Sequence, residues 1–233
     1  MAVNYSPKII TDGLIVYMDA ANINSYPGSG TAWTDLGMSQ SNNSVLTGGA
    51  TFSSANMGSI AFNGTSSYAI SATYSSLVGN TAITYSFWVK STSNANYQTL
   101  ISNGVQPGGS GFVWIFRNPS SNFITMQYAN GSIAVNSSTG SFFNNDNLWI
   151  NICCVVDYNN ALITWYKNGV LHSGPTALTT PLVPINWSYY MGSYNASSHF
   201  LNGNISTVKF YNRILTDTEV LQNYNAIKGR FGL

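Results

Sequence analysis

The sequence predicts an all-β fold that is closed by one short C-terminal helix. Strand-like runs recur at intervals of about 8–12 residues, and turn dipeptides such as Asn63-Gly64 and Asn168-Gly169 separate several of them. Short, evenly spaced strands are typical of a sandwich or a barrel. No stretch has the composition of a linker, so we expect one domain over residues 13–233, preceded by an N-terminal arm over residues 1–12.

The strands are predicted from the pattern of apolar side chains. In residues 82–90 the odd positions are apolar or aromatic and the even ones are mostly polar, which is the pattern of a strand with one buried face. The run from Leu148 to Tyr158 is the longest and is mostly apolar on both faces, which indicates a central strand covered on both sides. The predicted strands cover residues 13–19, 59–63, 67–71, 82–90, 97–102, 111–117, 122–128, 132–135, 148–158, 161–167, 189–193 and 205–212.

The helix is predicted from a capping box followed by helical spacing. Thr216 is a suitable N-cap, and Glu219 stands three residues later, where its side chain can return to the cap. Apolar residues follow at helical spacing as far as Ile227. Gly229, between two basic residues, is expected to end the helix.

Motifs spread over nearly the whole chain resemble a known family. The family pattern reads roughly F-x-G-x-I-x-x-V-x-x-Y-N-R-x-L-T-x-x-E, and this chain fits it from Gly203 to Glu219, with Phe200 one position further upstream than the pattern has it; GLIVYMDAAN, FNGTSSY, ITYSFWVK and ITWYKNGVL occur earlier. This set resembles the laminin G-like, concanavalin A-like lectin/glucanase domains. The resemblance implies two antiparallel sheets in a jelly-roll sandwich. The opening from Gly13 to Leu36 and the closing KGRFGL also resemble structural proteins of tailed bacteriophages, particularly those that infect cyanobacteria.

Charged residues are scarce in this chain. They make up 6% of the sequence, with eight Lys or Arg and seven Asp or Glu, and the net charge is +1; about 25% is usual. A surface with so little net charge favours association; the amide-rich coat of a secreted or marine protein is an alternative explanation. We expect a homo-oligomer, for example a trimer, because the resemblance to phage structural proteins implies three-fold sites. The absence of a basic stripe argues against a nucleic-acid partner.

The two cysteines, Cys153 and Cys154, are adjacent, so on a strand they point to opposite faces. We expect both to be buried and reduced. The opening MAVNYSPKII lacks the apolar segment of a signal peptide, and no apolar run reaches the ~18 residues of a membrane span. These observations predict synthesis in a host cytoplasm, followed for a phage component by assembly into the virion.

The acidic residues of the chain argue against catalysis. Glycoside hydrolysis needs two carboxylates about 5–9 Å apart. The only glutamate is Glu219, which is assigned to the helix cap, and no two aspartates lie within four positions of each other. His172 and His199 are expected to be surface residues, without a nucleophile motif. The sequence therefore predicts a protein that is not an enzyme.

A calcium site is the one cofactor that the resemblance suggests. Many relatives hold Ca²⁺ at the rim of the sandwich, and Asp35 and Asp146 lie in predicted loops where they could act as ligands. The family often shows F-D-G-x-D-D-Y where this chain has FNGTSSY, so Asn63, Ser66 and Ser67 replace acids. No cofactor is therefore expected, with Ca²⁺ as the alternative.

Aromatic side chains and amides could bind sugar or a protein partner, since sugar rings stack on aromatic faces and their hydroxyls bond to amides. For any one of these residues taken alone, a structural interpretation as a core or interface side chain is the favoured one. The candidates are Trp114, Tyr128, Trp187, Tyr189, Tyr190, Tyr194, Asn195 and His199.

Three functions follow from these observations, in order of preference. The first is a non-enzymatic structural protein of a phage virion, as a head decoration or a module of a tail appendage, which acts by contact with other capsid or tail proteins. The second is a carbohydrate-binding adhesin or receptor-binding lectin domain. The third is a degenerate glycoside hydrolase.

Overall fold

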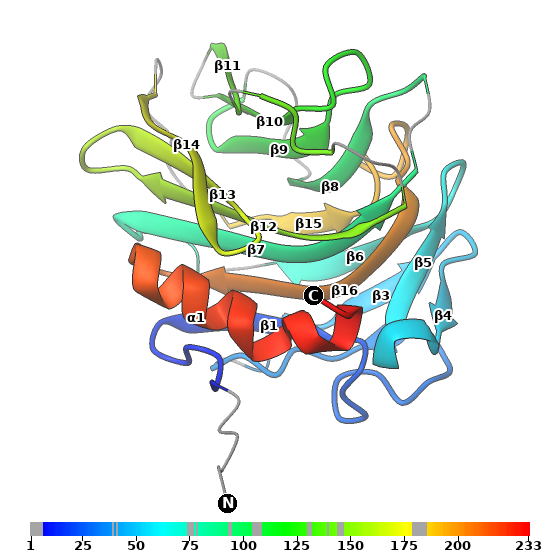
Figure 1. Ribbon diagram of the computed structural model, residues 1–233. Coiled ribbons are helices and arrows are strands. Elements are labelled where there is room, and N and C mark those ends of the chain that lie inside the picture. The colour runs from blue at the N-terminus through cyan, green and yellow to red at the C-terminus, as the bar shows by residue number, and fades with distance from the viewer. Residues whose placement is uncertain are drawn as a thin grey trace, which may run out of the picture.

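The chain folds into two antiparallel β-sheets that pack face to face, with one helix on the outside (Figure 1). The computed structural model describes residues 7–38, 40, 42–73, 77, 79–92, 95–103, 109–129, 132–138, 140–143, 147–178 and 186–233. This architecture is the antiparallel jelly-roll sandwich with a short C-terminal helix that the sequence predicts, so the fold prediction is confirmed.

The first sheet, which we call sheet A, contains eight strands among the described residues. Its three central strands are the longest: β7 pairs with β12 on one side and with β16 on the other. The order is β14 (Val170–Ala177), β13 (Leu162–Lys167), β12 (Trp149–Asp157), β7 (Ala82–Ser91), β16 (Asn202–Tyr211), β5 (Ser59–Asn63) and β4 (Thr51–Ser53), with β1 (Leu14–Asp19) also paired to β16.

The second sheet, sheet B, also has eight strands in the part of the chain that is described. Strand β11 forms one edge, and the two-residue strand β2 forms the other. The order is β11 (Ile133–Ser137), β10 (Ile124–Ala129), β9 (Phe112–Arg117), β8 (Gln98–Asn103), β15 (Ser188–Met191), β6 (Tyr68–Thr73), β3 (Ser44–Thr47) and β2 (Ala32–Trp33).

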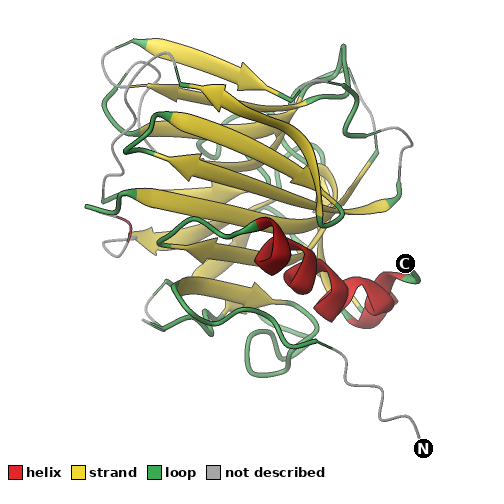
Figure 2. Cartoon of the chain, turned by 60° about the vertical axis from the view of Figure 1, so that its left-hand side comes forward, coloured by secondary structure: helices red, strands yellow, loops and turns green. Residues whose placement is uncertain are grey.

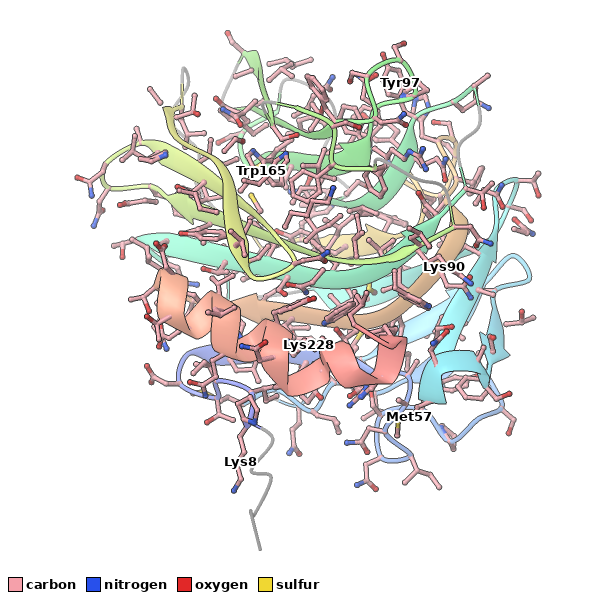
Figure 3. All side chains as sticks on the ribbon, viewed as in Figure 1. Lys8, Met57, Lys90, Tyr97, Trp165 and Lys228 are labelled. Atoms are coloured by element: carbon pink, nitrogen blue, oxygen red, sulfur yellow. The ribbon has the colours of Figure 1, made fainter. Side chains whose placement is uncertain are left out.

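The main hydrophobic core lies between the sheets. On β7 the side chains of Ile83, Tyr85, Phe87 and Val89 are fully buried there, as the alternation in the sequence predicts. Trp165 of β13 also lies between the sheets (Figure 3), and its Nε1 donates to Asn136 Oδ1 at 2.9 Å. Burial of each large apolar side chain contributes about 1.5–3 kcal/mol, so this core accounts for the packing of the two layers.

The C-terminal helix α1 (Asp217–Ile227) covers the outer face of sheet A (Figure 2). It begins at the predicted capping box, in which Thr216 and Glu219 satisfy each other's backbone N–H groups. Cys153 and Val155 of β12 pack beneath the helix, while Cys154 faces the main core. Both cysteines are free and buried, as expected, and β12 is covered on both sides.

A 3-10 segment, η3 (Lys228–Phe231), continues the chain from α1, and a second one, η1 (Ala55–Met57), contacts it. Phe231 and Tyr224 stack on the two sides of the buried Trp88, with ring centroids 4.3 and 5.5 Å away. The residues before β1 pack on the outer face of sheet A beside α1, where Tyr211 Oη donates to the carbonyl of Ile10 at 3.0 Å. The outer face of sheet A is therefore covered over its central strands.

Every predicted strand is present, with ends that differ by a few residues, but the short strands β2, β3 and β4, and β14 after the predicted hairpin turn, were not among the predicted strands. The Asn168-Gly169 dipeptide forms the expected hairpin turn, with positive φ at both residues, and leads into β14. Among the described residues, no helix is both long and apolar enough to cross a membrane.

Candidate functional site

Strand β15 places two neighbouring tyrosines on opposite faces of sheet B. Tyr189 and Met191 point into the core, whereas Ser188 and Tyr190 point outward. On the outer face, Tyr190 stands opposite Ile70 of β6 on one side and Ser102 of β8 on the other. The ring of Tyr68, also on β6, lies 6.1 Å from that of Tyr190. The middle of this face is therefore aromatic.

A hollow of about 370 Å³ opens beside Tyr190 at the end of these strands. Trp187 is its most prominent aromatic side chain, since 43% of its surface is exposed. The polar side chains in the lining are neutral, and the Thr73 and Ser188 hydroxyls lie 3.5 Å apart. The hollow is lined by Thr73, Asn186, Trp187, Ser188 and Tyr190. It combines exposed aromatic surface with hydroxyl and amide groups.

A packed aromatic cluster stands next to this hollow on the same face. Trp114 of β9 lies at its centre, with Phe116 stacked at 4.0 Å and His199 stacked at 5.1 Å. Only 6% of Trp114 is exposed, and its Nε1 donates to Thr99 Oγ1 at 2.9 Å. Burial lowers the pKa of His199, which favours the neutral imidazole. Trp114 therefore supports the face and has little surface left for a ligand.

The loop after β15 holds this cluster in place. Asn195 N donates to Ser102 Oγ at 3.2 Å, and Ser102 Oγ donates to the carbonyl of Ser193 at 3.0 Å. The ring of Tyr194 lies 4.7 Å from that of Trp114. These contacts join the loop to the centre of the sheet, one strand away from Tyr190.

The structure thus brings six of the eight candidate residues to one face of sheet B. Two are accessible at the hollow, and four form or adjoin the packed cluster. They are Trp187 and Tyr190, then Trp114, Tyr194, Asn195 and His199. His199 is partly exposed, and its ring stacks on Trp114. His172 is half-buried against Phe142, with ring centroids 4.4 Å apart.

Tyr128 and Tyr189 are the two exceptions, and their interpretation as contact residues is wrong. Both belong to the buried core between the sheets. Tyr189 packs its ring edge against Phe210 of sheet A, at a centroid distance of 5.8 Å. For Tyr128 the alternation in β10 already pointed inward, because Ile124, Met126 and Tyr128 share one face and Thr125 and Gln127 the other. For Tyr189 the strand is short and the adjacent Tyr190 faces outward, so the sequence pattern could not assign its direction.

Two further aromatic residues belong to this face but were not among the candidates. Tyr97 is partly exposed and makes edge contacts with Trp114, Phe116 and His199. Figure 3 shows it at the far side of the molecule from Lys228. Tyr68 is the other. Tyr68 and Tyr97 lie at the start of predicted strands, where a side chain can reach the surface, and this position could have identified them from the sequence.

The candidate calcium ligands do not form a site in the described residues. Asp35 is buried, and its Oδ1 accepts from the backbone N–H groups of Tyr17 and Gly37 at 2.8 and 2.7 Å. Its Oδ2 accepts from Asn42 Nδ2 at 2.9 Å. Asp146 lies outside the described residues. Within the described ranges, no three His, Cys, Asp or Glu residues come together as metal ligands.

The FNGTSSY motif forms a turn held by Asn63. Its Oδ1 accepts from the backbone N–H groups of Thr65, Ser66 and Ser67 at 2.9–3.1 Å. A single amide therefore organises this loop.

Each carboxylate in the described residues has a structural partner. Glu219 is paired with Arg213 and closes the helix cap, and this ion pair lowers its pKa to about 2. Asp19 is held by Arg230 at 2.7 Å. Asp217 accepts from Tyr166 Oη at 2.6 Å, Asp12 contacts Arg213, and Asp157 accepts from Asn160. None of these is placed at the hollow on sheet B.

A second, mainly apolar hollow of about 310 Å³ lies at the start of β12, on the side of the C-terminal segment. Trp149 forms part of its wall, next to Phe231 at 4.6 Å, and Lys167 is at the rim. This hollow is separate from the aromatic face of sheet B.

Together, the fold and the partly exposed aromatic face define a lectin-like β-sandwich. Residues 62–221 match the family model of the concanavalin A-like lectin/glucanases superfamily. The chain therefore belongs to this superfamily, as its motifs indicated. No curated protein sequence matches the chain.

Solved structures with the same fold include several binding domains. Domain 4 of AbnA, an extracellular GH43 arabinanase from Geobacillus stearothermophilus in complex with arabinotriose, superposes with a TM-score of 0.71 and 16% identity, over 92% of this chain and 100% of that one. The binding domain of botulinum neurotoxin serotype G gives 0.67 and 17%, over 91% of this chain and 50% of that one.

A structure of botulinum neurotoxin type C, whose cell entry depends on two ganglioside molecules, gives a TM-score of 0.70 and 14% identity. It aligns over 94% of this chain and 52% of that one. The chain thus spans about half the length of the toxin domains that it matches. At these identities the similarity establishes the fold.

Proposed function

We propose that this chain is a non-catalytic carbohydrate-binding domain, and that it binds its ligand at the hollow formed by Trp187 and Tyr190. The observation that carries the proposal is an exposed tryptophan beside hydroxyl and amide groups, on the open face of a lectin-like sandwich. The C–H face of a sugar ring packs on an aromatic ring, and its hydroxyls bond to groups such as those of Asn186 and Ser188.

The solved structures with this fold support the same function. Domain 4 of AbnA was obtained with arabinotriose, and the type C toxin enters cells through gangliosides. The carboxylates of this chain support binding over hydrolysis, because those in the described residues are engaged in structural contacts. A degenerate glycoside hydrolase would instead need an acidic pair facing a groove.

The test is a glycan array followed by calorimetry with the oligosaccharide that binds best. Trp187→Ala should weaken binding at least about tenfold, which corresponds to ~1.4 kcal/mol, and should leave the melting temperature nearly unchanged. Leu221→Ala on α1 is the matched control, because 42% of Leu221 is exposed but it lies on the opposite side. Equal binding by the wild type and Trp187→Ala would reject this site.

A second candidate is a structural component of a phage virion, on the head or a tail appendage, which contacts other virion proteins and copies of itself. The phage-like opening and closing motifs and the low charge favour it. The edge strand β11 adds an observation, since Ile133 and Val135 are exposed there. Imaging of purified particles tests it: hundreds of copies per virion would indicate decoration, and absence from the virion would exclude this role.

A further inference from the structure

The charged residues are distributed unevenly between the two sheets. Among the described strands of sheet B, only Arg117 is charged. The strands of sheet A and the C-terminal helical segments contain Asp19, Lys90, Asp157, Lys167, Lys209, Asp217, Glu219, Lys228 and Arg230. The few charged residues of these elements are therefore concentrated on the side of sheet A.

Arg117 does not change this, because its side chain is turned away from the open face. It is buried, and its guanidinium donates to Ser91 Oγ at 2.8 Å and to Asn122 Oδ1 at 2.7 Å. It also lies over the ring of Phe143 at 4.7 Å. The described strands of sheet B thus present no charged side chain on their outer face.

The segments that adjoin the hollow in the sequence are also uncharged. Residues 74–78 follow β6, residues 104–108 follow β8, and residues 179–187 precede β15. None of these segments contains Asp, Glu, Lys, Arg or His. This statement rests on the sequence alone, so it holds for any arrangement of these segments.

Such a site should bind a charged ligand weakly. A carboxylate or sulfate that enters the hollow loses hydration, and no cation compensates for the loss. Sugar hydroxyls instead find neutral donors and acceptors in Thr73, Asn186 and Ser188, beside the rings of Trp187 and Tyr190. The chemistry of the lining therefore discriminates against acidic sugars.

We infer that the ligand of the Trp187–Tyr190 hollow is an uncharged glycan, and that sialylated, uronic-acid-containing and sulfated glycans are excluded. This inference rests on the proposed carbohydrate-binding function and adds the class of ligand to it. It also predicts weak dependence on salt, because binding would pair no opposite charges.

The experiment uses glycans that share one backbone and differ only in charge. Lactose-based probes without an acid, with sialic acid and with sulfate are compared, together with neutral and acidic plant oligosaccharides. We expect binding to neutral members, acidic counterparts weaker by at least about tenfold, and little change between low and high salt. Preferred binding of acidic members that depends on Trp187 would overturn the inference and retain the proposed function. No binding to any glycan would overturn both.

A gain of charge provides the second arm. Thr73→Lys places a cation at the rim of the hollow, so it should increase binding of sialylated or sulfated probes and make it sensitive to salt. Thr51→Lys is the control, since Thr51 is an exposed threonine on β4 of sheet A. If Thr73→Lys binds neutral probes as before and gains no acidic ones, the ligand is not at this hollow and the inference is wrong.

Discussion

Lys209 is a cation buried under the C-terminal segment on the outer face of sheet A. Its Nζ lies 5.3 Å from the centre of the Tyr17 ring, beside the Asp19–Arg230 ion pair. Burial lowers the pKa of Lys209 to about 8, and the nearby Asp19 carboxylate opposes this shift. Burial of the charged Lys209 amine therefore lowers the stability of the folded state.

This cost gives a prediction with a definite pH dependence. Below pH ~8 the amine is protonated in the folded and unfolded chain, so the folded state carries the full cost; between about 8 and 10.5 the folded chain releases the proton first, and stability rises. Lys209→Met should therefore raise the melting temperature at pH 7 by a few degrees, consistent with ~1–3 kcal/mol. The gain should shrink toward pH 10.

The control is Lys8→Met, which removes an exposed lysine and should have little effect at either pH. Thermal unfolding of the three proteins across this range provides the comparison. A loss of stability in Lys209→Met at pH 7 would contradict the account, because it would show that the charge is favourable in place.

The prediction of individual site residues from the sequence was limited by strand direction. Tyr189 and Tyr190 are adjacent, and only the packing of β15 shows that the first faces the core and the second the surface. Likewise, FVWIFR in β9 is apolar on both faces, so the sequence alone could not show that Trp114 points outward. Trp187 lies just before β15, where the alternation of the strand does not apply, and its side chain is exposed.

At the level of elements, the C-terminal helix depends on a few polar contacts at its start. Glu219 receives the backbone N–H of Thr216 at 2.9 Å and both terminal nitrogens of Arg213 at 2.7 and 2.9 Å. These contacts lower the pKa of Glu219 from 4.5 to about 2. Because α1 covers sheet A, its cap contributes to the stability of the whole sandwich.

Glu219→Gln should therefore destabilise the protein by ~1 kcal/mol near neutral pH. The depressed pKa means that the contribution of the ionised group is present above pH ~4.5 and is lost as the pH falls toward about 2. Chemical denaturation of both proteins at several pH values should show their stabilities converging below pH 3. A constant difference across the whole range would assign the effect to packing and not to ionisation.

Three of the four strands that the sequence did not predict are short; the fourth, β14, has eight residues but is interrupted by Gly174 and Pro175. The long strands β7 and β12 and the capped helix have patterns that repeat several times, and these were predicted with nearly correct ends. Strands β2, β3 and β4 have two to four residues and lie among glycines and polar residues. At such lengths the alternation cannot establish a strand, and pairing with β5 and β6 determines it.

For the whole molecule, low charge and an exposed apolar edge act together. The net charge is +1 and the isoelectric point is about 7.7, so repulsion between copies is weak near neutral pH. Val135 on the edge strand β11 is 55% exposed. An edge strand with unpaired backbone groups and apolar side chains is a template for pairing with another chain.

We therefore expect wild-type protein to associate most strongly near its isoelectric point, and Val135→Lys to weaken this association without lowering the melting temperature. The control is Val170→Lys on β14, an edge strand of sheet A, which adds the same charge at a valine that is 62% exposed. Light scattering over a range of concentrations and pH values compares the three proteins. A larger effect of Val135→Lys would identify β11 as the contact, because both variants change the net charge equally. Equal effects would show that net charge governs association and that β11 has no special part in it.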